Sequence, residues 1–202
     1  MLEAAAACRE ALRPHVEADW SRLAGDLDWD CRQTLDHIVD ALAYYCAHLA
    51  TRAGSELPFT RDGAPSASID ELIVCVGSQA AVLARVVEAS PAGTRAFHSA
   101  GMADPAGFVA MGCDEILVHT NDICMGLGVE FEPPAALCAK VVERLFPWAP
   151  EHPDRWEALL WCNGRMALPG HERLDPSWSW WCRPLGEWDG VAYARTRPPA
   201  WS

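Results

Sequence analysis

The stretch CDEILVHTND, residues 113–122, places two carboxylates and an imidazole on one stripe of a predicted helix. Glu115, His119 and Asp122 stand at positions i, i+4 and i+7, a spacing that brings side chains together on consecutive helical turns. Residues 116–118 between them are apolar, so the helix is apolar around most of its girth, which is typical of a central helix. Because an unpaired buried charge is costly, the stretch predicts a helical core with a polar site inside it.

The Glu115–His119 pair allows three interpretations. It can be a solvated surface pair, it can have an arginine as its buried partner, or it can bind a metal cation as helical bundles do with carboxylates and imidazoles that project inward. A catalytic zinc site takes three protein ligands, so another helix must supply the third. His37 and His48 lie on one predicted helix. They are about 16 Å of helical rise apart, so they cannot both reach one ion.

Helix start and stop signals divide most of the chain into helices. Two capping boxes begin helices, one at Asp30 with Gln33 and one at Ser68 with Glu71. Residues 53–67 form a loop rich in Gly, Pro and Ser. Apolar periodicity and these signals predict six helices: 2–23, from 30 to the loop at 53, from 68 to about 90, 104–128, from 133 or 134 to about 146, and from 154 to about 166.

Composition and charge limit the classes of protein that the chain can be. Half of the 202 residues are apolar, and 16 basic against 28 acidic residues give a net charge of −12, which disfavours nucleic acid and anionic membranes as partners. No uninterrupted apolar run approaches the roughly 18 residues of a membrane span, and the N-terminus does not read as a signal peptide. The nine cysteines form no C-x-x-C pair, so we expect reduced core cysteines in a cytoplasmic protein.

The C-terminal part differs in composition from the rest. Eight of the ten tryptophans follow residue 147, and the segment 177–190 alternates partially as a short strand or an extended strap does. We predict a single all-α domain over 1–202, with a four-helix core over about 2–128 and additional helices and a Trp-rich strap over about 133–196. Tryptophans in such a tail most often cover a bundle face. Bundles with apolar tails often dimerise, so a homodimer is an expectation as well.

Three stretches of the sequence resemble segments of a known family. DWDCRQTLDHIVDAL, residues 28–42, is similar to the GW(S/T)VRDTLAHI opening of the second helix in the DinB-like superfamily. DEILVHTNDICMGLG, residues 114–128, is similar to its ELVVHGWDLARATG segment, and NGRMALPG, residues 163–170, also resembles a recurring segment. The resemblance covers residues 5–190 and is closest to the mycothiol-dependent maleylpyruvate isomerase N-terminal domain family.

The resemblance implies a four-helix bundle that holds a divalent metal, usually zinc, with His37, Glu115 and His119. It implies an open metal position for water or a thiol, and thiol-dependent isomerase or S-transferase activity with mycothiol or bacillithiol. The chain departs from the family pattern at Asn121, where an aromatic residue is usual, and at DLDW, residues 26–29, where CPGW is frequent. We also expect no separate C-terminal domain such as that of the isomerase.

Three functions follow as alternatives: a metal- and thiol-dependent S-transferase or isomerase acting on a small electrophile, a metal-dependent hydrolase of a small molecule, and a non-catalytic bundle. The third would bind a small molecule or a partner protein, with or without metal, in self-resistance or stress. Two imidazoles and a carboxylate accept Zn²⁺, Ni²⁺ or Fe²⁺. Asp122 either holds a ligand or an arginine in place, or forms a surface salt bridge. Arg165 and Arg183 are candidate contacts for a large, polar mycothiol-type thiol.

Overall fold

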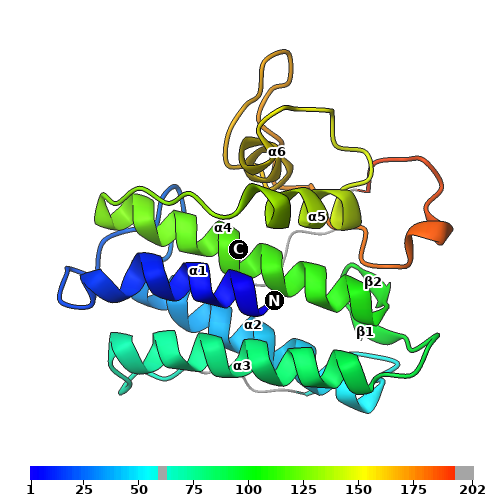
Figure 1. The fold of residues 1–202 in the computed structure, drawn as a ribbon, viewed down its shortest axis with the longest axis horizontal. Coiled ribbons are helices and arrows are strands. Elements are labelled where there is room, and N and C mark those ends of the chain that lie inside the picture. The colour runs from blue at the N-terminus through cyan, green and yellow to red at the C-terminus, as the bar shows by residue number, and fades with distance from the viewer. Residues whose placement is uncertain (59–62, 194–202) are drawn as a thin grey trace.

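The protein is mostly helical in a computed structural model that describes residues 1–58 and 63–193 (Figure 1). The end of the predicted strap, Trp201 and residues 59–62 of the long loop lie outside the described residues. The α-helices are α1 (Leu2–Leu12), α2 (Cys31–Thr51), α3 (Ile69–Ala89), α4 (Pro105–Leu127), α5 (Ala135–Leu145) and α6 (Arg155–Cys162). Short elements complete the order: the 3₁₀ helices Arg13–His15 and Leu185–Glu187, and the antiparallel strands β1 (Ala96–His98) and β2 (Gly101–Ala103).

The first four helices lie side by side, and the C-terminal helices cover one of them. Both α1 and α2 pack against α3 and against α4. On the other side of α4, α5 packs against α4 and α6 packs against α5 (Figure 1). The helix that carries the predicted site therefore lies between the N-terminal helices and the C-terminal region.

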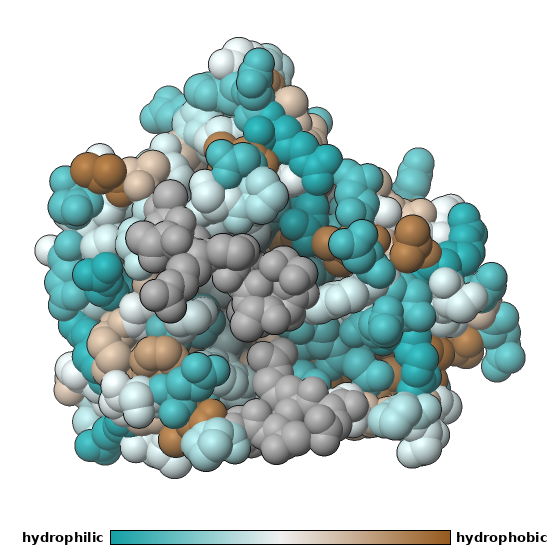
Figure 2. All heavy atoms as spheres, turned by 180° about the vertical axis from the view of Figure 1, so that it is seen from behind, coloured by the Kyte–Doolittle hydropathy of each residue, from teal (hydrophilic) through white to brown (hydrophobic). Residues whose placement is uncertain are grey.

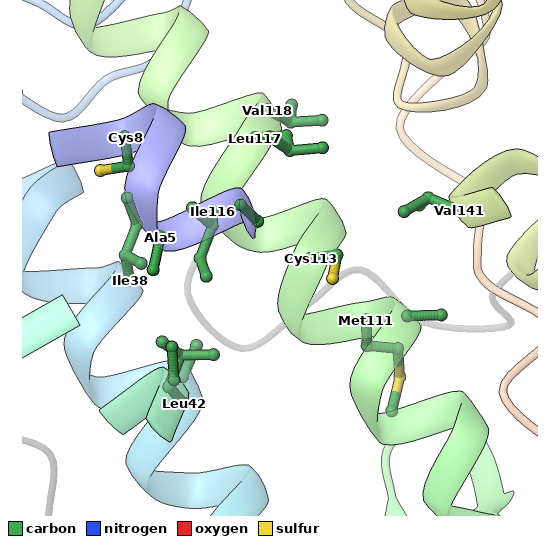
Figure 3. Packing of buried hydrophobic residues seen from close by; sticks show 14 of the residues in the cluster. Ala5, Cys8, Ile38, Leu42, Met111, Cys113, Ile116, Leu117, Val118 and Val141 are labelled. Atoms are coloured by element: carbon green, nitrogen blue, oxygen red, sulfur yellow. The ribbon is translucent and has the colours of Figure 1, made fainter. Parts of the chain in front are cut away.

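Burial on all sides confirms that α4 is central. Sixteen of its 23 residues are buried. Ile116 lies beside Ala5 of α1 and Ile38 of α2, whereas Leu117 projects toward Val141 of α5 (Figure 3). Each aliphatic side chain that is fully buried in this way contributes about 1.5–3 kcal/mol to folding, so α4 anchors both halves of the core.

The end signals in the sequence position the long helices as predicted. Both capping boxes are formed, with Asp30 at the start of α2 and Ser68 at the start of α3. Asp104 caps α4 by accepting a hydrogen bond from the backbone N–H of Gly107, and Gly128 ends that helix in the left-handed conformation. Because α2 and α4 carry the predicted site, these local caps fix where its residues fall along each helix.

Two predicted helix ends were wrong, and one hairpin was missed. The first helix ends at Leu12 rather than near residue 23, because Pro14 lacks the N–H that a longer helix requires. The sixth ends at Cys162 rather than near 166, with Gly164 in a left-handed conformation just beyond it. Between 177 and 190 the chain forms an irregular strap with a 3₁₀ turn and no strand, while the β1–β2 hairpin was not predicted.

The described residues on one face of the molecule are mostly polar. Seen from behind, hydrophilic residues dominate, and apolar residues form separate small patches (Figure 2). Eight of the nine cysteines are buried, and Cys75 on α3 is exposed. By length and composition alone, α3 is long and apolar enough to cross a membrane, the one such helix in the described ranges; here it packs against α1 and α2.

Two helical glycines, one on α4 and one on α3, differ in how closely other atoms pack around them. A Cβ on Gly126 of α4 would lie 2.4 Å from the carbonyl oxygen of Leu23 and 2.5 Å from Sγ of Cys31, whereas a Cβ on Gly77 of α3 meets nothing within 4 Å. Gly126→Ala should therefore lower the free energy of unfolding by about 1–3 kcal/mol. Gly77→Ala should raise it by about 0.5–1 kcal/mol, since alanine is the better helix former. Urea unfolding measures both, and equal effects of the two substitutions would contradict this packing.

Candidate metal centre

Side chains from α2 and α4 meet at one point inside the protein. The potential ligand atoms of His37, Glu115 and His119 all lie within 4.8 Å of one another, the one such group found in residues 1–58 and 63–193. Nε2 of His37 lies 3.3 Å from Oε2 of Glu115, and Nε2 of His119 lies 3.2 Å from the same oxygen. The structure thus brings together the three residues that the sequence assigned to a metal.

The donor atoms have the chemistry and the spacing of a cation site. Zn²⁺ binds imidazole nitrogen and carboxylate oxygen at about 2.0–2.1 Å in tetrahedral geometry, which separates neighbouring donors by about 3.3 Å. The two nitrogen-to-oxygen distances match that separation. Two imidazoles and one carboxylate are also a donor set of catalytic zinc sites, where a fourth position remains for water or substrate. The residues therefore fit a divalent cation.

Local sequence explains how the three side chains reach this point. Glu115 and His119 are one turn apart on α4, which the Asp104 cap and Gly128 delimit. His37 lies two turns into α2, beyond its capping box. The ring of Trp29, just before that cap, lies against His37 with 4.9 Å between ring centroids. The imidazole of His37 is therefore packed on one side before any ligand binds.

Asp122 fixes the outer side of His119. Its Oδ2 lies 3.0 Å from Nδ1 of His119, and Arg165 donates to both carboxylate oxygens, from Nε at 2.9 Å and from Nη2 at 2.7 Å. Because Nδ1 is committed to a carboxylate, Nε2 faces the cation position, as at many histidine–metal sites. Asp122 is almost fully buried, with 1% of its side chain exposed, so it is a supporting group and not a surface salt bridge.

Tyr45 supports Glu115 in the same way. The Tyr45 hydroxyl donates to Oε1 of Glu115 at 2.9 Å, so Oε2 is the oxygen that faces the two imidazoles. Sequence reasoning missed this contact. The available signal was spacing, because Tyr45 follows His37 by eight residues, about two turns along the same face of α2.

Burial and the interactions between the ionisable side chains shift the pKa values of Glu115 and His119 in opposite directions. Burial raises the pKa of Glu115, but the charge of His37 and the hydrogen bonds of both imidazoles hold it well below its usual value. Burial lowers the pKa of His119, but hydrogen bonds to Asp122 and Glu115 outweigh it and raise the pKa to about 9. A cation that binds Nε2 of His119 at neutral pH therefore replaces a proton.

A pocket of ≈ 400 Å³ opens over the three residues. Its walls include Trp29 from the segment before α2, and Trp178 and Trp180 from the C-terminal strap. Arg165 also lines it. The volume is that of a small-molecule site, and the tryptophans that the sequence assigned to covering the bundle thus also shape a cavity.

A further carboxylate, Asp114, lies in this pocket and was not predicted. Asn163 donates to its Oδ1 and the indole of Trp180 donates to its Oδ2, both at 2.8 Å. Burial raises the pKa of Asp114 to about 7, against the effect of the Asn163 hydrogen bond. Through these bonds Asp114 ties the end of α6 and the strap to α4, beside the metal ligands.

Other residues that the sequence singled out lie elsewhere. Arg183 is outside the pocket lining, and its guanidinium lies over the ring of Trp181, 4.7 Å from the centroid. His48 is buried away from the site, where its Nδ1 lies 3.0 Å from the carbonyl oxygen of Tyr44 and its Nε2 accepts from the N–H of Leu57. Of the two arginines predicted to contact a ligand, the structure brings only Arg165 to the pocket.

Comparison of the chain with protein-family models, with curated proteins and with solved structures gives no match.

Removing a metal ligand should remove the metal. His37→Ala should reduce bound zinc from about one equivalent to less than about a tenth, because two ligands on one helix cannot complete the site. His171→Ala, which changes an exposed histidine, is the matched control and should keep full occupancy. Elemental analysis after zinc loading and dialysis measures both. Full zinc content in His37→Ala would show that His37 is not a ligand.

Loss of the Asp122 charge should weaken zinc binding without abolishing it. Asp122→Asn keeps the shape but no longer balances Arg165 or supports the basicity of His119, so zinc affinity should fall by about 10–100-fold. Asp70→Asn breaks the exposed Arg13–Asp70 pair on the surface and should leave affinity unchanged. Competition titration with a chromophoric chelator measures both constants. Equal zinc affinities of the two variants would show that Asp122 does not support zinc binding.

Proposed function

We propose that the chain is a DinB-like four-helix bundle, similar to the mycothiol-dependent maleylpyruvate isomerase N-terminal domain family, in which a divalent metal activates a low-molecular-weight thiol. The observation that carries the proposal is the convergence of His37, Glu115 and His119 under a small-molecule pocket. The packing of α1 and α2 against α3 and α4 is what such a bundle requires. The ligands come from two of the stretches on which the resemblance rests.

Zinc is the metal we propose, with nickel and iron as the alternatives that the donor set accepts. When bound, a divalent cation stabilises the ionised form of a coordinated thiol at neutral pH. A thiol held there would lose its proton to solvent, and its sulfur would attack an electrophilic carbon of the substrate. In S-transfer a carbon–sulfur bond would form while the leaving group departed with its electron pair. In isomerisation the thiolate would add to an activated double bond and leave that bond's electron pair on the substrate; the resulting single bond would rotate, and the electron pair would re-form the double bond as the thiolate is expelled.

The chain's own residues position this chemistry. Asp122 and Arg165 hold the ring of His119, and Tyr45 holds Glu115 so that one carboxylate oxygen faces the site. The half-buried Trp29 and Trp178 provide apolar walls that exclude part of the water. Exclusion of water strengthens electrostatic interactions between these groups and a bound substrate.

An assay with a chromogenic electrophile tests the proposal. Zinc-loaded protein should accelerate consumption of the electrophile only when mycothiol is present, chelation should remove the activity, and added zinc should restore it. His119→Ala should be inactive, and the exposed-residue variant His171→Ala should be fully active. Turnover that is independent of thiol would instead indicate a metal-dependent hydrolase. Zinc binding without any turnover of a panel of electrophiles would indicate a non-catalytic binding protein.

A further inference from the structure

We infer that α3 is the interface of a homodimer, in which α3 of a second copy of this chain lies antiparallel against its exposed face. The inference is independent of the proposed function, because α3 supplies no residue to the described metal centre or to the pocket over it. It depends on three properties of the helix: an uncharged apolar face that is exposed, opposite charges at the two ends of that face, and the symmetry of both about one residue.

The position of α3 in the bundle does not account for its apolar composition. The helix packs against α1 and α2 at the edge of the bundle, on the side away from α5 and α6 (Figure 1). Five of its 21 residues are buried, against 16 of 23 in the central helix α4, yet its composition is apolar enough for a membrane span. No residue between Glu71 and Arg85 is charged. Because an outer helix normally has a polar outer face, this face of α3 has the composition of a covered surface.

Two valines are exposed on this face. The exposed fraction is 58% for Val74 and 47% for Val82, and Ser78 lies midway between them, about one helical turn from each. The hydroxyl of Ser78 donates to the carbonyl oxygen of Val74 at 2.9 Å, so its hydrogen bond survives when water is excluded. The neighbouring exposed residues Cys75 and Ala81 are also small, so a second helix can approach closely.

The charges at the two ends of this face are opposite in sign and equally far from Ser78. Glu71 lies two helical turns before Ser78, and Arg85 lies two turns after it. In an antiparallel pair with its two-fold axis at Ser78, Glu71 of each copy lies across from Arg85 of the other, and the valines lie between these ion pairs. A parallel pair would place like charges against each other at both ends. Because like charges across an interface are unfavourable, the charges select the antiparallel arrangement.

Both end residues can form these contacts and keep their present ones. The bonds between Glu71 and Ser68 use Oε2 of Glu71, so Oε1 can accept from a second copy. Arg85 donates from Nη1 to Glu88, 82% of its side chain is exposed, and its guanidinium has further N–H donors. The contact is small, because one helix packs against one helix. We therefore expect a weak dimer with a micromolar dissociation constant.

Sedimentation equilibrium of the full-length protein tests the inference. Between about 1 μM and 1 mM the wild type should change from monomer to dimer. Arg85→Glu should weaken dimerisation at least about ten-fold, because it places a carboxylate opposite Glu71, and the double variant Glu71→Arg, Arg85→Glu should restore the dimer. Lys140→Glu, the same change of charge at an exposed position of α5, is the control and should leave the dissociation constant unchanged.

Three results would overturn the inference. The first is a protein that stays monomeric at every concentration, and the second is a dimer that Arg85→Glu does not weaken. The third is a monomer that binds neutral phosphatidylcholine vesicles, which would assign this face of α3 to a membrane surface. Loss of the dimer in the double variant as well would overturn the antiparallel arrangement.

A disulfide across the two-fold axis locates the interface. Cys75→Ser removes the exposed thiol, and the other eight cysteines are buried. In this background Ser78→Cys should give a covalent dimer on oxidation with copper phenanthroline. Ala89→Cys, exposed on the same face, should not, because its two copies would be about 33 Å apart. Non-reducing electrophoresis measures both.

This cross-link decides the inference if Arg85→Glu does not fold. Equal cross-linking of Ser78→Cys and Ala89→Cys, or none of Ser78→Cys at a concentration where the protein is dimeric, would overturn it.

Discussion

The burial of three carboxylates on one helix is the constraint on which the rest of the structure depends. Asp114, Glu115 and Asp122 lie in the interior of α4, where water cannot solvate them. An uncompensated charge there would cost several kcal/mol, a large part of the net stability of a domain of this size. Each carboxylate is instead bonded to groups from other elements. The positions of α2, the end of α6 and the strap relative to α4 are therefore set by polar contacts as well as by packing.

These contacts make the C-terminal region part of the site. Asn163 ends α6, Arg165 follows it, and Trp180 lies in the strap. Asn163 and Trp180 donate to Asp114 of α4, and Arg165 donates to Asp122 of α4. Arg165 also donates to the backbone carbonyl of Asn163. A chain that ended near residue 128 would leave Asp114 without either donor and Asp122 without its arginine. The chain thus consists of a helical core followed by a C-terminal region that covers it. Residues of both parts are needed to form the pocket and to hold the metal ligands in place.

The sequence predicts what local geometry controls. Capping residues and helical periodicity gave the starts of α2, α3 and α4, and the spacing of Glu115 and His119 follows from one helical turn. The third ligand came only from the family resemblance, because spacing within a helix does not determine which helix lies opposite. Tyr45 and Asp114 were missed for the same reason: their roles depend on the register between packed elements. The hairpin was missed because three-residue strands are too short to show a period.

The central claim is that α2 and α4 hold one divalent cation between them. Anomalous diffraction from crystals of the zinc-loaded protein, recorded on both sides of the zinc absorption edge, tests it most directly. The account predicts a single strong peak about 2.0–2.1 Å from Nε2 of His37, Nε2 of His119 and one oxygen of Glu115. A peak elsewhere on the protein, or the present imidazole–carboxylate contacts unchanged and without a peak, would contradict it.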